Sequence, residues 1–323
     1  MPKISVVVPS YNQGCVLRRT LESLYSQGVS KEDFEIIIVD DASTDDTYHV
    51  VSRFLKDDKA GFLSYKKNRE NSGSARTRNK GLKLAKSNLV LFINADNVLD
   101  PDCLSQHLSF HRRYPQNHVA VQGYSRSPKD IELDPIKMLD DVTSPLDKLK
   151  HGDFCSWEKF SSMHISFKKD FIKEGFDETL FDKMIGFEDN EFAFRLAKKG
   201  LKIILNKKAV AYHYHFRTPE EFLNKVYRYG KAFCNWIAKD ESFGKEKKYI
   251  NSYLPYYCGA ISLKGIKYSL QRLLINENTI DSIKSLAKRS EKNNKTLSVF
   301  IYKRLYNYYF MKGYNEFKQK QEE

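Results

Sequence analysis

The sequence predicts an α/β fold in which a mostly parallel sheet carries helices on both faces and a C-terminal helical extension follows. Two observations lead to this prediction. Short apolar runs alternate with stretches whose apolar residues recur at helical spacing. The apolar runs are also nearly continuous, which is typical of parallel strands buried on both faces.

The composition favours one large domain with a smaller appendage. The chain has 323 residues, of which 41% are hydrophobic and 13% aromatic. These fractions are sufficient for a packed core, and they exclude a disordered chain. We expect a main domain over residues 1–238, with halves at 1–97 and 98–238, and an extension over residues 239–323.

Residues 1–97 supply four predicted strands separated by helices. After the first strand, apolar residues recur at helical spacing from Val16 to Tyr25. The loop DDASTDDT opens the next helix, because Ser and Asp side chains cap exposed backbone amides. A third helix covers residues 74–85. The predicted strands are residues 3–9, 34–39, 62–65 and 89–93.

The second half of the main domain is less regular. A segment rich in Pro, Asp and Lys is typical of a long surface loop or short helices that recognise a partner. The last predicted helix has Thr218 as its cap and Pro219 at its first position. The predicted elements are strands at 119–124 and 161–167, the loop at 127–153, and helices at 189–199 and 218–238.

Three predicted strands end in polar residues. These ends read PSYN (9–12), DDAS (40–43) and NADN (94–97). In open parallel sheets the carboxyl ends of the strands lie at one edge, where ligands bind. Asp, Asn and Ser also make good turns and caps, so a structural role stays open for each loop. Three such ends together favour a binding site.

Seven segments follow one another in a distinctive order and spacing between residues 3 and 229. They are VVVPSYN (6–12), VDDASTDDT (39–47), ENSGSARTRNKG (70–81), INADN (93–97), GFDE (175–178), GFEDNEF (186–192) and AVAYHYH (209–215). The set resembles the inverting family 2 glycosyltransferases with the GT-A fold, a Rossmann-like sheet. The resemblance implies a hexosyl- or N-acetylhexosaminyltransferase of polysaccharide synthesis, with a nucleotide diphosphate sugar, UDP above all, as donor.

The resemblance also implies which residues bind the donor nucleotide. Asp41 would accept the imide hydrogen of uracil, and Tyr11 and the backbone near Pro9 would border the base. Arg78 would lie near the diphosphate or the adjacent carboxylates. As alternatives, Asp41 could cap the helix after Ser43, and Arg78 could be an exposed helix charge.

A divalent cation, Mn²⁺ or Mg²⁺, is the cofactor that the resemblance implies. The family binds it through Asp-x-Asp, and Asn94 and Asp96 stand at those positions. Asp96 would be the ligand, since phosphates and water supply the other oxygens, while the Asn94 amide would still hydrogen-bond the ribose or donor sugar. His213 would complete the site, with His215 as substitute or support. Core packing is the alternative for both histidines, and His164 is expected at the acceptor edge or in the core.

The segment GFEDNEF (186–192) brings three carboxylates together. Inverting transfer requires one carboxylate to take the proton of the acceptor hydroxyl. By resemblance Asp189 is this base and Glu188 holds sugar hydroxyls, although the reverse assignment stays open. Glu191 is expected only to interact with the helix dipole, and that role is also the alternative for Asp189.

Two other functions are compatible with parts of the sequence. A nucleotidyltransferase on a similar sheet would have a Gly-rich, basic signature after its first strand, and PSYNQGCVLRR lacks one. A catalytically idle module that docks an anionic polymer or membrane is favoured by Asn94 and the basic extension. Asp96, Asp189 and His213 argue against this second interpretation.

The C-terminal extension is basic. The net charge is +13, and residues 241–323 contain 16 Lys and Arg against 8 Asp and Glu. Such a surface attracts anionic lipid and phosphate-rich polymers, and with the resemblance we expect a glycan, lipid-linked or protein acceptor rather than nucleic acid. Residues 296–313 fit a helix on a membrane surface, a helix packed on the catalytic domain, or one at a homodimer interface.

The cysteines and the N-terminus indicate the cytoplasm. Five cysteines are scattered singly, without a C-x-x-C pair or a disulfide-like spacing. The first apolar run ends at Pro9 and has no small-residue cleavage site, so no signal peptide is predicted. We expect a cytoplasmic protein that is soluble or peripheral on the inner face of the cell membrane.

Overall fold

The computed structural model describes residues 1–128, 130, 134–142, 146–181, 186–214, 217–254 and 274–322. The chain forms two compact units, which we call unit 1 and unit 2. Unit 1 consists of Met1–Asp130, Ser144–Lys183 and Glu188–His215. Unit 2 consists of Ile131–Thr143, Met184–Phe187 and Phe216–Glu323.

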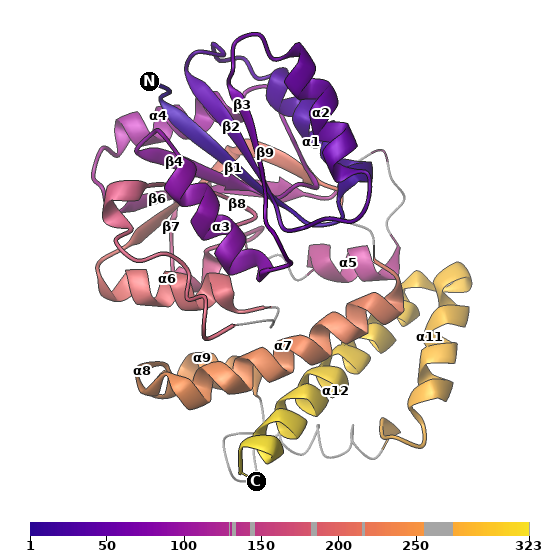
Figure 1. The fold of residues 1–323 in the computed structure, drawn as a ribbon. Helices are drawn as coiled ribbons and strands as arrows, with labels where there is room; N and C mark the ends of the chain where they lie inside the picture. Colours follow the sequence, from indigo (N-terminus) through magenta and orange to yellow (C-terminus); the bar gives the residue numbers. More distant parts are fainter. Residues whose placement is uncertain are drawn as a thin grey trace. The chain divides into compact units, whose positions relative to one another are not determined.

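Unit 1 is built on a nine-stranded sheet (Figure 1). The strand order is β3-β2-β1-β4-β8-β6-β9-β5, and β7 pairs with β9. The strands are β1 (Ile4–Ser10), β2 (Phe34–Asp40), β3 (Leu63–Lys67), β4 (Leu89–Ile93), β5 (Asn97–Leu99), β6 (Val119–Arg126), β7 (Phe154–Cys155), β8 (His164–Lys168) and β9 (Lys202–His213).

The four strands predicted in the first half are confirmed, and they are parallel to one another. The second half is mixed, because β8 runs antiparallel to both β4 and β6, while β6 and β9 are parallel. The short antiparallel strands β5 and β7 were not predicted. They have three and two residues, too few for an alternating pattern to be recognised.

Helices cover both faces of this sheet, as predicted. One apolar core joins the sheet to α1, α2 and α4, and a second core joins its other face to α3 and α6. The helix α4 was not predicted, because two of its buried positions are histidines, which break the apolar period. The helices are α1 (Gly14–Tyr25), α2 (Thr47–Asp57), α3 (Gly73–Leu84), α4 (Cys103–Arg113), α6 (Glu188–Lys198) and the 3-10 turns Trp157–Lys159 and Lys169–Phe171.

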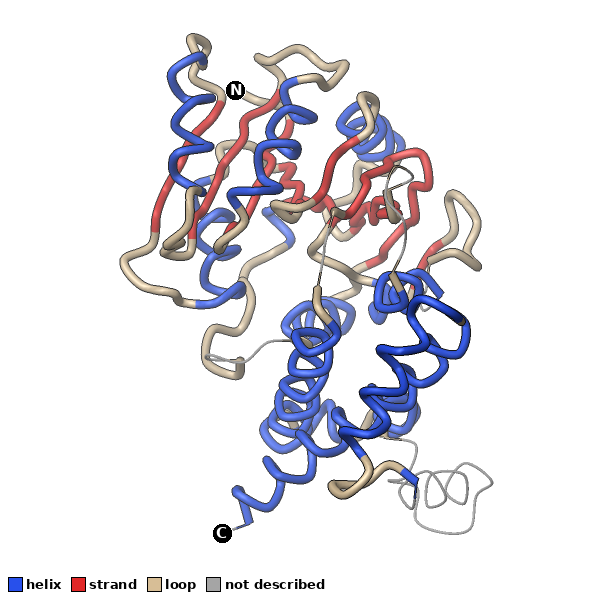
Figure 2. The backbone as a smooth tube through the Cα atoms, turned by 90° about the vertical axis from the view of Figure 1, so that its right-hand side faces the viewer, coloured by secondary structure: helices blue, strands red, loops and turns tan. Residues whose placement is uncertain are grey.

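Unit 2 is helical, and its described residues contain no strand (Figure 2). Thr218 caps α7 as predicted: its hydroxyl accepts from the Glu221 amide at 3.2 Å, and the Glu221 carboxylate accepts from the Thr218 amide at 2.8 Å. The helices are α5 (Pro135–Val142), α7 (Pro219–Lys239), α8 (Glu241–Gly244), α9 (Lys247–Tyr253), α11 (Ile280–Asn293) and α12 (Lys295–Glu322).

Two sequence expectations are refined in unit 2. The start of the expected extension, residues 239–248, is mostly helical, because the Asp240 carboxylate accepts from the Ser242 and Phe243 amides and so starts α8. The loop expected at 127–153 contains α5, one of the short helices allowed for there. Within unit 2, α12 packs along α7. The functional boundaries at residues 97 and 238 stay predictions.

Two glycines bring α7 and α12 close together. A Cβ atom on Gly313 would lie 1.9 Å from the Tyr227 carbonyl oxygen, and one on Gly230 would lie 2.0 Å from the Phe310 carbonyl oxygen. Both distances are far below van der Waals contact, so only glycine allows this approach. The face of α12 that contains Leu305 and Phe310 is buried, which supports the packed-helix alternative for residues 296–313.

Within the described part of the chain, no helix is long and apolar enough to cross a bilayer. Phe300 and Leu297 of α12 are exposed, so contact with a membrane surface stays a prediction.

Candidate active site

The predicted site begins at three neighbouring strand ends. The strands β2, β1 and β4 lie side by side and run parallel, so their carboxyl ends meet at one edge of unit 1. Pro9 and Tyr11 stand at the end of β1, Asp41 follows β2, and Asn94 follows β4. The structure thus brings the predicted nucleotide-binding residues together at this edge.

Asp41 holds the start of α3 in place. Its Oδ1 atom accepts from the Ser72 amide at 2.9 Å, the Ser72 hydroxyl at 2.9 Å and Asn68 Nδ2 at 2.8 Å. Its Oδ2 atom accepts from the Gly73 amide at 2.8 Å. Asp41 therefore caps α3, not the helix after Ser43. A carboxylate has about four lone-pair directions, so Oδ2 keeps capacity for one further donor such as an imide N–H.

The loops after β1 and β2 are tied to each other. The Asn12 amide donates to the Ser43 hydroxyl at 2.9 Å, and the Thr44 amide donates to the Asn12 side-chain oxygen at 2.9 Å. Asn12 and Ala42 both have positive φ angles, of 51° and 64°. Non-glycine residues rarely adopt this conformation, and it is concentrated at functional sites. The neighbouring Tyr11 ring is 46% exposed and is available to a ligand.

Arg78 is buried on α3 and is not the exposed helix charge that the sequence left open. Its Nη2 atom lies 3.5 Å from the Asn94 side-chain oxygen, and its Nη1 atom lies 3.8 Å from Glu188 Oε1. Its Nε and Nη1 atoms have no hydrogen-bond partner among the described residues. Buried N–H groups are nearly always hydrogen-bonded, so these two indicate an anionic or polar ligand.

Asp96 and His213 lie next to each other, as a shared metal ion would require. Asp96 Oδ2 is 3.3 Å from His213 Nε2, because β5 pairs Asn97 with His213. Two ligands of one octahedral ion are about 3 Å apart, so this pair fits a divalent cation. An oxygen and an imidazole nitrogen suit Mn²⁺ better than Mg²⁺. His215 lies outside the described residues.

Asp189 occupies the first turn of α6. Its Oδ2 atom accepts from the Ser162 amide at 2.9 Å, whereas its buried Oδ1 atom has no hydrogen-bond partner among the described residues. Burial raises the pKa of the Asp189 carboxyl and neighbouring Glu188 reinforces this, while Arg78 opposes it. A buried carboxylate with one unpaired oxygen and a raised pKa is suited to accept a proton.

Glu188 lies beside this base. Its Oε1 atom accepts from the Ser74 hydroxyl at 2.8 Å, so residues of α3 and α6 are joined at the site. Glu191 instead forms a two-point ion pair with Arg195, at 2.7 and 3.1 Å, and lies away from Asp189 on the buried side of α6. Glu191 was expected only to interact with the helix dipole, and the structure adds this ion pair with Arg195.

Two positioning groups were missed in the sequence. The Ser162 backbone amide binds Asp189, and no side-chain pattern could have revealed a backbone donor. Asn79 binds the GFDE segment at both ends: its amide nitrogen donates to the Phe176 carbonyl and Glu178, and its oxygen accepts from the Phe176 amide. Asn79 belongs to ENSGSARTRNKG (70–81), so its position was a usable signal.

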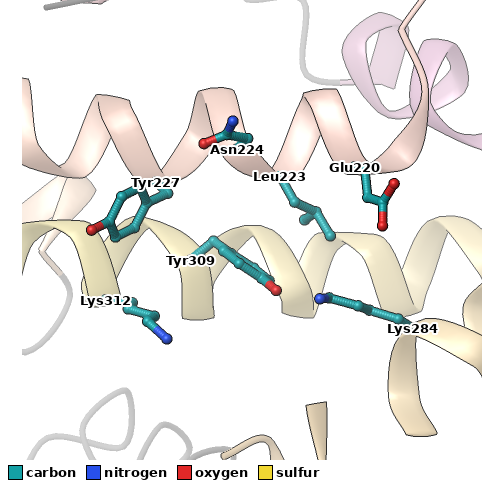
Figure 3. Close-up of a pocket in the computed structure, with 7 residues that line it drawn as sticks. All are labelled: Glu220, Leu223, Asn224, Tyr227, Lys284, Tyr309 and Lys312. Carbon is teal, nitrogen blue, oxygen red and sulfur yellow. The ribbon is translucent and has the colours of Figure 1, made fainter. Parts of the chain in front are cut away.

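A pocket of about 270 Å³ lies within unit 2, between α7, α11 and α12 (Figure 3). None of the predicted site residues lines it. Its two lysines interact with neighbouring carboxylates: Lys312 with Glu277 at 2.8 Å, and Lys284 with Asp281 at 3.4 Å. No side chain that lines the pocket has a buried polar atom without a hydrogen-bond partner among the described residues.

Solved structures that resemble this chain share its fold at low sequence identity. Mannosyltransferase PcManGT from Pyrobaculum calidifontis, in complex with GDP-Man and Mn²⁺, has a TM-score of 0.64 at 17% identity, over 98% of this chain and 87% of that one. TarS 1–349 of S. aureus, in complex with UDP-GlcNAc, has a TM-score of 0.55 at 16% identity, over 98% and 92%. The fold is GT-A, as expected.

Sequence comparison identifies the family. Poly(ribitol-phosphate) beta-N-acetylglucosaminyltransferase TarP of Staphylococcus aureus (strain N315) is 33% identical over 139 residues, 41% of this chain and 41% of TarP. The chain spans 17% to 65% of the length of the first curated relatives that it matches. The model described as Glycosyl transferase family 2 matches residues 5–171. As this match covers more than half of the 323 residues, the chain belongs to glycosyl transferase family 2.

Proposed function

We propose that the protein is an inverting glycosyltransferase that moves a sugar from a uridine diphosphate donor to an acceptor hydroxyl. The observation that carries the proposal is the Asp189 carboxylate. One of its oxygens is fixed by the Ser162 amide, and the other is buried without a partner among the described residues. Arg78 and Glu188 lie beside it, so the proposed base, a second carboxylate and a guanidinium group are close together.

In this proposal Asp189 accepts the proton of the acceptor hydroxyl as the hydroxyl oxygen attacks the anomeric carbon. The bond from that carbon to the diphosphate oxygen breaks in the same step, and the configuration inverts. The raised pKa makes Asp189 a stronger proton acceptor than an ordinary carboxylate. Glu188, held by Ser74, would orient sugar hydroxyls.

The donor would bind along the edge formed by β2, β1 and β4. Tyr11 and Pro9 would border the base, and Asp41 Oδ2 would accept the uracil imide hydrogen. The Nε and Nη1 groups of Arg78, which lack a hydrogen-bond partner among the described residues, would donate to the diphosphate, and Asn94 would hydrogen-bond the ribose or sugar. Asp96 and His213 would hold Mn²⁺ or Mg²⁺, which when bound neutralises diphosphate charge and so stabilises the leaving group.

The printed names of similar proteins support the donor and the acceptor class. TarP is named as an N-acetylglucosaminyltransferase, and TarS was solved with UDP-GlcNAc, whereas PcManGT was solved with GDP-Man. TarP acts on poly(ribitol-phosphate). A net charge of +13 suits a phosphate-rich acceptor, so we assign the protein to the synthesis of a cell-surface polymer.

The remaining expectations complete the proposal. Residues 1–97 would bind the nucleotide, residues 98–238 the acceptor, and residues 239–323 would form the extension. The protein would be cytoplasmic. Its basic extension would lie near an anionic membrane surface, where a lipid-linked acceptor is within reach, or would form a homodimer interface.

Thermal unfolding with nucleotides tests the donor class. The full chain is heated with UDP, GDP, CDP or TDP, each with Mn²⁺, Mg²⁺ or a chelator. At about 100 times its dissociation constant a ligand adds roughly 2.7 kcal/mol, which raises the midpoint by about 4 °C for a chain of this size. UDP with Mn²⁺ should give this shift, and the chelator should remove it. No shift with any nucleotide would contradict the proposal and favour the idle module.

A further inference from the structure

One cysteine and two histidines form a buried cluster in unit 1. Cys103 and His107 are four residues apart on α4, so their side chains point to the same side of the helix, and His164 opens β8. All three side chains are fully buried. We propose that Cys103, His107 and His164 bind a zinc ion, at a site separate from the cation pair Asp96 and His213.

Three potential metal ligands converge on one another. His164 Nε2 lies 3.2 Å from Cys103 Sγ and 3.1 Å from His107 Nε2. All three atoms lie within 4.8 Å of one another. Around tetrahedral zinc, with bonds of about 2.0 Å to nitrogen and 2.3 Å to sulfur, ligand atoms are about 3.3–3.6 Å apart. The two measured pairs would have to open by only a few tenths of an ångström.

A single hydrogen bond cannot join His164 Nε2 to both of its close neighbours. A ring nitrogen of neutral histidine has either one proton or one lone pair, so it makes one good in-plane hydrogen bond. His164 Nε2 has two close polar neighbours, Cys103 Sγ and His107 Nε2. A zinc ion would be bound by all three atoms at once, with the thiol proton released to solvent as the thiolate forms.

Neighbouring groups orient both rings for this role. The Ser166 hydroxyl lies 2.8 Å from His107 Nδ1 and also 2.8 Å from His111 Nε2. A His107 Nδ1–H that donates to this hydroxyl leaves the Nε2 lone pair free for a metal. The Ser125 hydroxyl lies 3.4 Å from His164 Nδ1 and would act in the same way.

The sheet leaves room for the His164 ring. A Cβ atom on Gly123 of β6 would lie 2.4 Å from both Cε1 and Nε2 of that ring. Any side chain at residue 123 would displace the ring or the strand. The glycine thus keeps the Nε2 atom of His164 where Cys103 and His107 can meet it.

The ligand chemistry selects zinc over Mn²⁺ or Mg²⁺. A thiolate with two imidazoles is a soft donor set typical of Zn²⁺, and three protein ligands leave the fourth position for one solvent molecule. The ion would join α4 to β8. Ser162, two residues before His164, provides the amide that binds Asp189, so the site would hold the segment that positions the base.

Metal analysis of the full chain tests the site. Protein purified without chelator and passed through a desalting column should hold about one zinc per chain. Cys103→Ser and His164→Gln should each reduce this to below about 0.1. Cys234→Ser, which removes a buried cysteine of α7 outside the cluster, should leave the zinc content unchanged, and Asp96→Ala should do the same.

Binding of Co²⁺ by the wild-type chain tests the site without any substituted variant. Apo protein titrated with Co²⁺ should develop a thiolate-to-cobalt band in the near ultraviolet and strong visible bands of tetrahedral cobalt, complete at about one equivalent. Added Zn²⁺ should abolish them. Folded wild-type protein that holds less than about 0.1 zinc after titration with Zn²⁺, or that gives no thiolate band, would overturn the proposal. Equal zinc binding by Cys103→Ser would overturn it too.

Discussion

The interiors of the two units of the molecule are built from different kinds of residue. In unit 1, Arg78 and Asp189 have buried polar atoms without a hydrogen-bond partner among the described residues, and both lie where the strands end. The core of unit 2 is aromatic: Phe187, Phe233 and Phe310 pack together, and Trp236 stacks on Phe243.

This difference separates function from stability. A buried polar group without a partner destabilises the fold by about 1–3 kcal/mol, so its retention in unit 1 indicates a ligand or a reacting group. Aromatic packing of the kind found in unit 2 stabilises a fold without requiring a ligand. Substitutions in unit 1 should therefore change activity more than stability, and those in unit 2 should do the reverse.

Among the residues outside the proposed base, the largest effect is expected for Asp96→Ala. Loss of the carboxylate removes one of the two proposed cation ligands, and sugar transfer should fall by about 10²–10³-fold. The metal-dependent stabilisation by UDP should disappear in thermal unfolding. Asp102→Ala changes an exposed carboxylate six residues further along the chain, directly before α4, and is the matched control. Transfer by Asp96→Ala at the rate of the control would remove Asp96 from the site.

Arg78→Met should have the next largest effect on activity. It removes the N–H groups expected to donate to the diphosphate, so we expect kcat/KM to fall by about 10–100-fold. Steady-state kinetics would measure this. Arg76→Met, on the same helix but 40% exposed, should be close to wild type. If both variants lost the same activity, a general charge effect would explain the result instead.

Gly313→Ala should affect stability rather than activity. The new Cβ would meet the Tyr227 carbonyl oxygen of α7, so the two helices must separate. Overpacking of this kind costs about 1–3 kcal/mol, and the unfolding midpoint should fall by several degrees. Activity per folded molecule should remain that of wild type. Gly244→Ala, where the new atom meets its nearest neighbour at 3.7 Å, is the control. A large loss of activity in folded Gly313→Ala would contradict the division between the units.

The smallest effect is a pH-dependent gain in stability for Asp189→Asn. Because the pKa of Asp189 is raised in the folded state, the folded chain binds more protons than the unfolded chain between pH 3.8 and that raised pKa. The contribution of Asp189 to the free energy of unfolding of the wild type therefore falls as pH rises through this window. The asparagine of the Asp189→Asn variant does not titrate, so the variant has no such loss. At pH 8 its midpoint should exceed that of wild type by about 2 °C, with a smaller difference near pH 4. A difference that grew toward acid pH would contradict the raised pKa.

Much of unit 1 could be predicted from its sequence. The apolar runs of β1, β2 and β4 and the polar residues after them are local features, and local features fixed both the strands and the edge where they end. The antiparallel direction of β8 was not predictable, because a five-residue apolar strand has the same pattern in either direction.

Contacts between residues far apart in the sequence also limit how well the site could be predicted. Asp41 follows β2, while its role in binding uracil stays a prediction; its four bonds to Asn68, Ser72 and Gly73 depend on residues about thirty positions away. His164 gave no local sign of its contact with Cys103, since 61 residues separate the two. Spacing along the chain identified the acidic residues, but only the fold showed which atoms lack a partner.

The central claim is that Asp189 is the base of the transfer reaction. The direct measurement is the rate of product formation by Asp189→Asn, alongside binding of UDP with Mn²⁺, with Asp170→Asn as an exposed control. We predict a loss of transfer of about 10³-fold, with nucleotide binding within about twofold of wild type. Transfer by Asp189→Asn within about tenfold of wild type would contradict the claim and direct attention to Glu188.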